Sequence, residues 1–218
     1  MRQLALDITA PPVPTFGNFI AGRNAEAIAH LRAAAAGAGE RFVYLWGEAG
    51  CGRTHLLRAA ALAAGAGAFY VACRANSVFD DAAPLLAADD VERLGSDAQV
   101  MLFHRYNALR ELGGSLIVSG SVPPVQLKLR ADLLTRLGWG LVVQVHALSD
   151  DEKIQALKQH ARERGFALPE EVCSYLLAHV PRDMGSLFAT LAALDRYALQ
   201  AKRAVTLPLL RDLLRRDK

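Results

Sequence analysis

The sequence has few cysteines, little net charge and no long apolar run. Its three cysteines, Cys51, Cys73 and Cys173, are odd in number and far apart, which favours reduced thiols of a cytoplasmic protein over a disulfide framework or a zinc site. No stretch reaches the ~18 consecutive apolar residues of a membrane span, and the N-terminus lacks the basic-then-apolar pattern of a signal peptide. A formal charge of +3 is too small to indicate nucleic-acid binding. We therefore expect a cytoplasmic protein with no membrane partner.

What the sequence does contain is apolar material for a core. Hydrophobic residues make up 52% of the 218 residues, and much of this is alanine and leucine, which favour helices. This length fits one ordinary domain, or a core with a small appendage. Residues 1–15 differ from the rest because the prolines of segment 11–14 favour an extended connector. We expect a tail and linker over 1–15.

Residues 16–148 alternate between helical and strand-like segments. Helices are expected over 24–36, 54–64 and 97–112. Short apolar runs predict strands over 42–46, 68–73, 84–88, 115–118 and 141–145. Such alternation predicts an α/β domain, with a parallel sheet covered by helices on both faces.

The pattern changes at residue 149, and no strand is evident beyond 150. Ser149 and Glu152 form a capping box that opens a helix, which we expect to stop at Gly165. Pro169 suits the first turn of another helix. Leu187, Leu191, Leu194 and Ala198 fall on one helical stripe. Residues 149–218 are therefore predicted to form a small all-α domain.

One loop carries a recognisable chemistry. Residues 47–54 read Gly-Glu-Ala-Gly-Cys-Gly-Arg-Thr, which fits the spacing of a phosphate-binding P-loop except that Arg53 occupies the lysine position. An apolar strand precedes the loop and a helix follows, so backbone N–H groups and the helix N-terminus could bind phosphate. Thr54 would supply a hydroxyl to Mg²⁺. A glycine-rich turn without a ligand remains the alternative.

An acidic pair follows the third expected strand. Asp89 stands where a Walker B aspartate would hold the metal, and Asp90 stands where many P-loop ATPases have a glutamate base. A solvated acidic turn is the alternative, since Asp80 and Asp81 form a similar pair nearby. The polar segment 119–121 follows the next strand and is a weaker candidate for a sensor of the γ-phosphate.

Several segments together resemble one family, that of the DnaA regulatory inactivator (Hda). Its members are DnaA-related AAA+ proteins. The resemblance covers essentially the whole chain, and the segments that carry it are Thr15–Phe19, the P-loop with its arginine, Gly120–Leu127, Thr135–Gly140, Leu148–Lys153 and Arg182–Met184. It implies a P-loop AAA+ domain followed by a helical lid.

The resemblance also implies roles for individual residues. Arg136 matches the family's arginine finger, which acts on a nucleotide held by a neighbouring subunit. Arg182 matches the sensor II arginine, which reaches from the lid to the nucleotide phosphates. The expected cofactors are ADP (or ATP) and Mg²⁺. The expected nucleotide-binding residues are Gly47, Gly50, Cys51, Gly52, Arg53, Thr54, His55 and Arg182.

The same resemblance gives the tail a function. Gln3, Leu4, Leu6 and Ile8 match the peptide by which this family docks on the DNA sliding clamp, the beta subunit of the polymerase. An edge strand is the alternative for these residues. The implied partners are the clamp and the DnaA initiator, with a homo-oligomer possible. Because DnaA continues into a helix-turn-helix domain where this chain stops, sequence-specific DNA binding is not expected.

These features lead to one functional hypothesis and two alternatives. We expect a regulator of replication initiation that stimulates hydrolysis of DnaA-bound ATP and is not an enzyme on its own. The pattern of active ATPases is not kept at Arg53, Asp90 and Ser121. We therefore expect the nucleotide bound by this chain to stabilise a conformation that is competent to bind partners. The alternatives are a self-sufficient ATPase of the helicase-loader or remodelling type, and an assembly module that binds nucleotide only structurally.

Overall fold

A computed structural model describes residues 13–216 of the chain. The residues fall into two compact units, one over Pro14–Ser149 and one that contains Asp150 and the residues after it. None of the described helices is long and apolar enough to cross a membrane.

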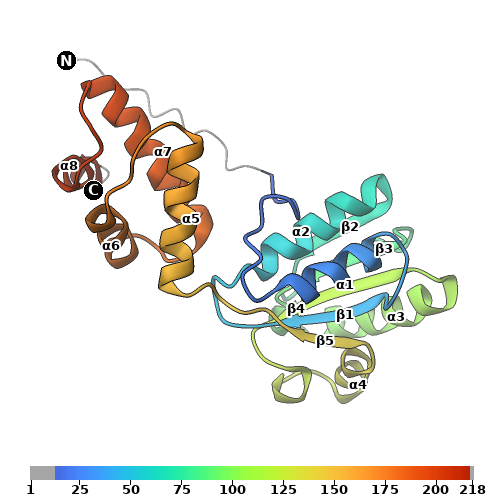
Figure 1. Cartoon of the computed structure of the whole chain (residues 1–218). Helices are drawn as coiled ribbons and strands as arrows, with labels where there is room; N and C mark the ends of the chain where they lie inside the picture. The colour runs from blue at the N-terminus through green and yellow to red at the C-terminus, as the bar shows by residue number, and fades with distance from the viewer. Residues whose placement is uncertain (1–12, 217–218) are drawn as a thin grey trace. The chain divides into compact units, whose positions relative to one another are not determined.

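The first unit is built on a five-stranded parallel sheet, coloured from blue to yellow in Figure 1. The strands lie in the order β2-β3-β4-β1-β5, and every neighbouring pair is parallel. Their bounds are β1 Phe42–Trp46, β2 Ala68–Ala72, β3 Leu85–Asp89, β4 Ser115–Gly120 and β5 Leu141–Gln144. Strands β3 and β4 are buried along their whole length, as expected for strands covered on both faces.

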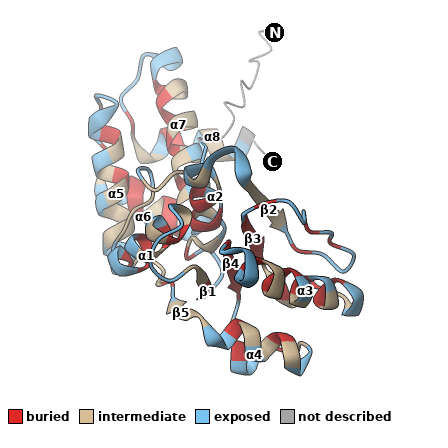
Figure 2. Ribbon diagram, turned by 90° about the vertical axis from the view of Figure 1, so that its right-hand side faces the viewer, coloured by how far each residue is buried: buried red, intermediate tan, exposed pale blue. Residues whose placement is uncertain are grey.

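Helices cover both faces of this sheet. The pair α1 (Ala25–Ala35) and α2 (Arg53–Ala64) packs on one face, and the pair α3 (Ser96–Leu112) and α4 (Ala131–Trp139) packs on the other (Figure 1). Alternate residues of β1 serve the two cores, since Val43 and Leu45 pack toward the first pair and Tyr44 toward the second. Figure 2 shows the buried side of these helices turned to the strands. The predicted α/β fold is confirmed.

The second unit is entirely helical over its described residues. It contains α5 (Asp150–Glu163), α6 (Glu170–His179), α7 (Met184–Ala201) and α8 (Leu207–Arg216). Its core is separate from those of the sheet. The expected stripe on α7 is buried and belongs to this core, with members Leu187, Leu191, Leu194 and Ala198.

Some local details differ from the expectations. Helices α4 and α8 were not predicted, and Asp89 is the last residue of β3 instead of following it. Pro169 precedes α6 as its N-cap residue and lies outside the first turn. Three short 3-10 helices also occur among the described residues, η1 (Gly65–Gly67), η2 (Val91–Arg93) and η3 (Pro124–Gln126).

Candidate functional site

The turn between β1 and α2 has the tight backbone that a phosphate-binding loop requires. Gly50 and Gly52 have φ values of 78° and 103°, a region that glycine adopts without steric cost. A Cβ on Gly47 would overlap the backbone carbonyl of Val145. A Cβ on Gly52 would lie 2.5 Å from the ring of Phe19, which packs directly on the loop. Glycine is therefore required at 47 by contact, and at 52 by contact as well as by conformation.

The first turn of α2 presents polar groups. No side chain caps this helix among the described residues, and the first N–H groups of a helix form a site that favours anions. Thr54 is exposed on this turn. His55 lies beside the ring of Phe19, and its Nε2 is 2.9 Å from the carbonyl oxygen of Thr15. The segment before α1 thus holds the start of α2 in place.

Arg53 is paired on one side only. Its Nη2 lies 3.6 Å from Oδ1 of Asp90, and the arginine side chain is 12% exposed. Its Nη1 is buried and has no hydrogen-bond partner among the described residues. A buried donor without a partner is costly, and a phosphate oxygen would supply the missing acceptor.

Asp90 lies between two arginines in a left-handed turn. Its φ is 57°, its Oδ2 is 3.4 Å from Nη2 of Arg93, and its backbone N–H donates to Oγ of Ser119 at 2.9 Å. Burial raises the pKa of Asp90, and the neighbouring Asp89 raises it further. Its carboxylate thus serves as counter-ion to Arg53 and Arg93.

Asp89 is almost fully buried, with 3% exposure. Its Oδ2 accepts a hydrogen bond of 2.9 Å from the hydroxyl of Tyr70, and its Oδ1 accepts one from the hydroxyl of Ser119. Ser119 therefore joins the ends of β3 and β4 by bonding to both aspartates. Nothing in the sequence pattern pointed to Tyr70, because its partner is set by the pairing of β2 with β3.

These residues fit an anionic phosphate group. The structure brings together the glycine turn, the exposed Thr54, the orphaned donor of Arg53 and the acidic pair. No cluster of three or more His, Cys, Asp or Glu side chains suited to a metal occurs within residues 13–216. A magnesium ion held by Thr54 and Asp89 would need phosphate oxygens to complete its ligands.

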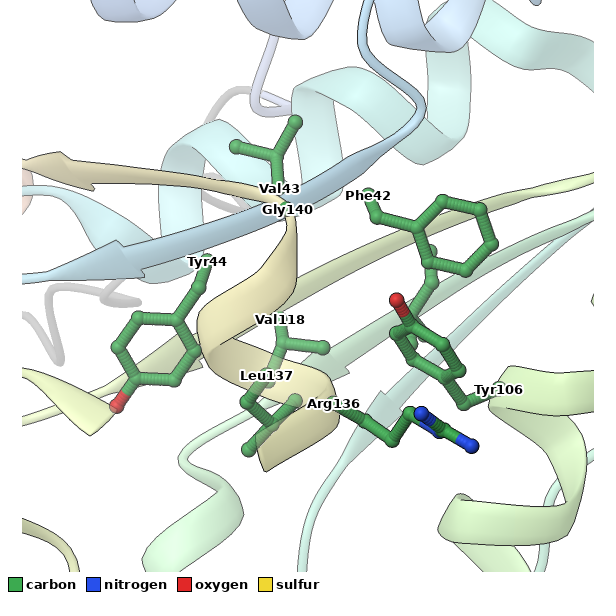
Figure 3. Close-up of a pocket in the computed structure, with 9 residues that line it drawn as sticks. Phe42, Val43, Tyr44, Tyr106, Val118, Arg136, Leu137 and Gly140 are labelled. Atoms are coloured by element: carbon green, nitrogen blue, oxygen red, sulfur yellow. The ribbon is translucent and has the colours of Figure 1, made fainter. Parts of the chain in front are cut away.

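Arg136 lies apart from this loop, and its contacts come from α3 and α4. Its guanidinium carbon lies 4.1 Å from the ring centre of Trp139 and 5.6 Å from that of Phe103. Its Nε donates to Oδ1 of Asn107 at 3.1 Å. Figure 3 shows its side chain directed toward the ring of Tyr106, in a crevice that these elements form with β1. Arg136 forms no ion pair within the described part of the chain.

Arg182 belongs to the helical unit and lies just before α7. Its Nη2 is 2.6 Å from Oδ2 of Asp150, and both side chains are more than half exposed. The following Asp183 caps α7 by accepting from the N–H of Ser186 at 2.9 Å. The expected clamp-binding residues, Gln3, Leu4, Leu6 and Ile8, lie outside the described residues.

Comparison with known proteins identifies the helical unit. Residues 150–214 match the family "Hda, lid domain". This match covers α5 to α7 and most of α8, so the second unit is a lid domain of the Hda type.

Solved structures identify the fold of the chain. The AMPPCP-bound DnaA of Aquifex aeolicus is 24% identical, with 87% of this chain and 67% of that chain covered and a TM-score of 0.71. Domain III of the Thermotoga maritima DnaA is 21% identical, covers 94% and 96%, and gives 0.75. The RuvB Holliday junction branch migration motor of Thermotoga maritima is 14% identical, covers 94% and 72%, and gives 0.67. The chain therefore carries a lid domain of the Hda family over residues 150–214, and it has the fold of DnaA domain III.

Proposed function

We propose that this protein regulates the initiation of chromosome replication by promoting hydrolysis of the ATP bound to DnaA. In this proposal residues 3–8 dock on the DNA-loaded sliding clamp, and Arg136 reaches the nucleotide held by DnaA. The ADP form of DnaA that results no longer supports initiation. The Hda lid domain of residues 150–214 and the likeness of the fold to DnaA domain III support this choice of partner.

The observation that carries the proposal is that no carboxylate among the described residues pairs with Arg136. Its guanidinium is held by aromatic rings and one amide oxygen, and it forms no ion pair within residues 13–216. Its positive charge is therefore not cancelled by a neighbouring carboxylate. An arginine acting in trans needs such a charge to neutralise the negative charge that builds on a γ-phosphate during transfer.

The chain's own P-loop has a different role in this proposal. Backbone groups of 47–54, the Nη1 of Arg53 and the hydroxyl of Thr54 would hold ADP or ATP with Mg²⁺, with His55 beside them and Arg182 added from the lid. The bound nucleotide would supply the phosphate acceptors that the loop lacks. Because Asp90 is paired with Arg53 and Arg93, it is poorly placed to accept a proton from an attacking water. The site is suited to holding a nucleotide.

The test uses purified DnaA loaded with labelled ATP, sliding clamp on DNA, and this protein. Arg136→Ala is expected to lower the stimulated hydrolysis by about a thousandfold, the lower end of the effect of an arginine finger. Arg162→Ala, an exposed arginine of the lid, serves as the matched control. Equal hydrolysis with the wild type and Arg136→Ala would refute the finger assignment.

Two further arms separate the remaining possibilities. Deleting residues 1–8 should abolish clamp binding and leave ADP binding intact, and clamp binding that survives the deletion would refute the docking assignment. The isolated chain should turn over ATP slowly or not at all. Rapid turnover without DnaA would favour a self-sufficient ATPase instead.

A further inference from the structure

We infer that Trp139 is a positioning residue for Arg136, holding its guanidinium ready for the nucleotide of the partner. This inference rests on the proposed function. The guanidinium carbon of Arg136 lies 4.1 Å from the centre of the Trp139 ring. That is well within the ~6 Å over which a cation is attracted to an aromatic ring, and tryptophan is the strongest partner for this contact.

Trp139 is placed for this contact and contributes little to the core. It is the last residue of α4 and is 56% exposed, although large apolar side chains are usually buried. A second guanidinium, that of Arg110, lies 5.4 Å from the same ring centre. An exposed indole with two arginines beside it is explained poorly by packing and well by cation–π contact.

The contact restrains the guanidinium of Arg136, the group that would contact the γ-phosphate. Its Nε already donates to Asn107, so a stacked ring fixes the plane of the guanidinium, whose terminal nitrogens then have a defined direction. A long side chain loses rotamer freedom when it is fixed on a phosphate. Stacking removes much of that freedom beforehand, which should raise the maximal rate and leave partner affinity nearly unchanged.

The test titrates Trp139 variants against ATP-loaded DnaA with clamp on DNA. Trp139→Leu keeps an apolar side chain but has no aromatic face, and it is expected to lower the maximal hydrolysis rate about fivefold, which is about 1 kcal/mol at 1.36 kcal/mol per factor of ten. The concentration for half-maximal stimulation should stay the same. Trp139→Phe should restore most of the rate. Arg110→Ala, which leaves the contact between Trp139 and Arg136, should keep the full rate.

Fluorescence gives a readout that does not depend on DnaA. In a Trp46→Phe background Trp139 is the remaining tryptophan of the sequence, and Arg136→Ala should increase its quenching by acrylamide, because one face of the ring is uncovered. Unchanged quenching, or a full maximal rate for Trp139→Leu, would overturn the inference. If Arg136→Ala itself left hydrolysis intact, the proposed function would fail, yet the quenching result would still decide whether the two side chains stack.

Discussion

The two terminal nitrogens of Arg53 are in different situations. Nη2 faces the carboxylate of Asp90, whereas Nη1 is buried without an acceptor. A lysine at this position would present one compact ammonium, but the planar fork of arginine can pair with an internal carboxylate and a phosphate at once. An arginine in place of the usual P-loop lysine is thus explained by its pairing with Asp90.

We predict that Arg53→Ala weakens binding of Mg²⁺-ADP by about ten- to a hundredfold, because a charge-assisted hydrogen bond contributes about 1.5–3 kcal/mol. Arg53→Lys should weaken it less, since the charge remains. Titration calorimetry measures both. Arg93→Ala removes the exposed partner of Asp90 and should leave ADP affinity within about twofold; wild-type affinity in Arg53→Ala would exclude Arg53 from the site.

At the scale of elements, the start of α2 requires glycine, whereas the interior of α4 does not. Gly52 has a φ of 103° and lies against Phe19. Gly138 lies inside α4 with nothing within 4 Å of an added Cβ. The same substitution should therefore have opposite effects at these two positions.

Gly52→Ala is expected to lower the free energy of unfolding by about 1–2 kcal/mol, the cost of a left-handed conformation for an L-residue, with further loss from the displacement of Phe19. Gly138→Ala should raise it by about 0.5–1 kcal/mol, because alanine favours a helix. Urea unfolding of both variants checks the pair. A stable Gly52→Ala variant would mean that the turn relaxes freely.

The sequence predicted most of these elements because their apolar patterns are strong, and it failed where length or context decides. Helix α4 is only nine residues long and contains Gly138, so its pattern was too short to stand out. The pairing of Arg53 with Asp90 could not be predicted either. It depends on the ends of β3 and β4 meeting beside the P-loop, which is a property of strand order.

At the scale of the molecule, the two units have separate hydrophobic cores. A titratable side chain, that of His160, packs beside the lid core, and its ring centre lies 4.6 Å from that of Phe188. Burial lowers the pKa of His160 below 6.5, and the charge of Arg164 lowers it further. Between that lowered pKa and 6.5 the unfolded lid binds a proton that the folded lid does not.

Stability of the lid should therefore fall as the pH drops through 6.5, and it should be fully present above that value. Amide hydrogen exchange at pH 7.5 and 5.5, corrected for intrinsic rates, should show the loss in α5 and α7. The loss should be smaller in His160→Gln and unchanged in His104→Gln, which alters the other unit. Equal sensitivity of the wild type and His160→Gln would rule out this histidine as the cause.

The strand order also has a consequence for synthesis on the ribosome. Strand β1 leads into the P-loop, yet its sheet neighbours are β4 and β5, which follow it by about 70 and 100 residues. A chain made at about 5–20 residues per second therefore leaves β1 without its neighbours for several seconds, and long-range parallel pairing of this kind is slow. The loop that begins at Gly47 is therefore translated well before the two strands that hold β1 in the sheet.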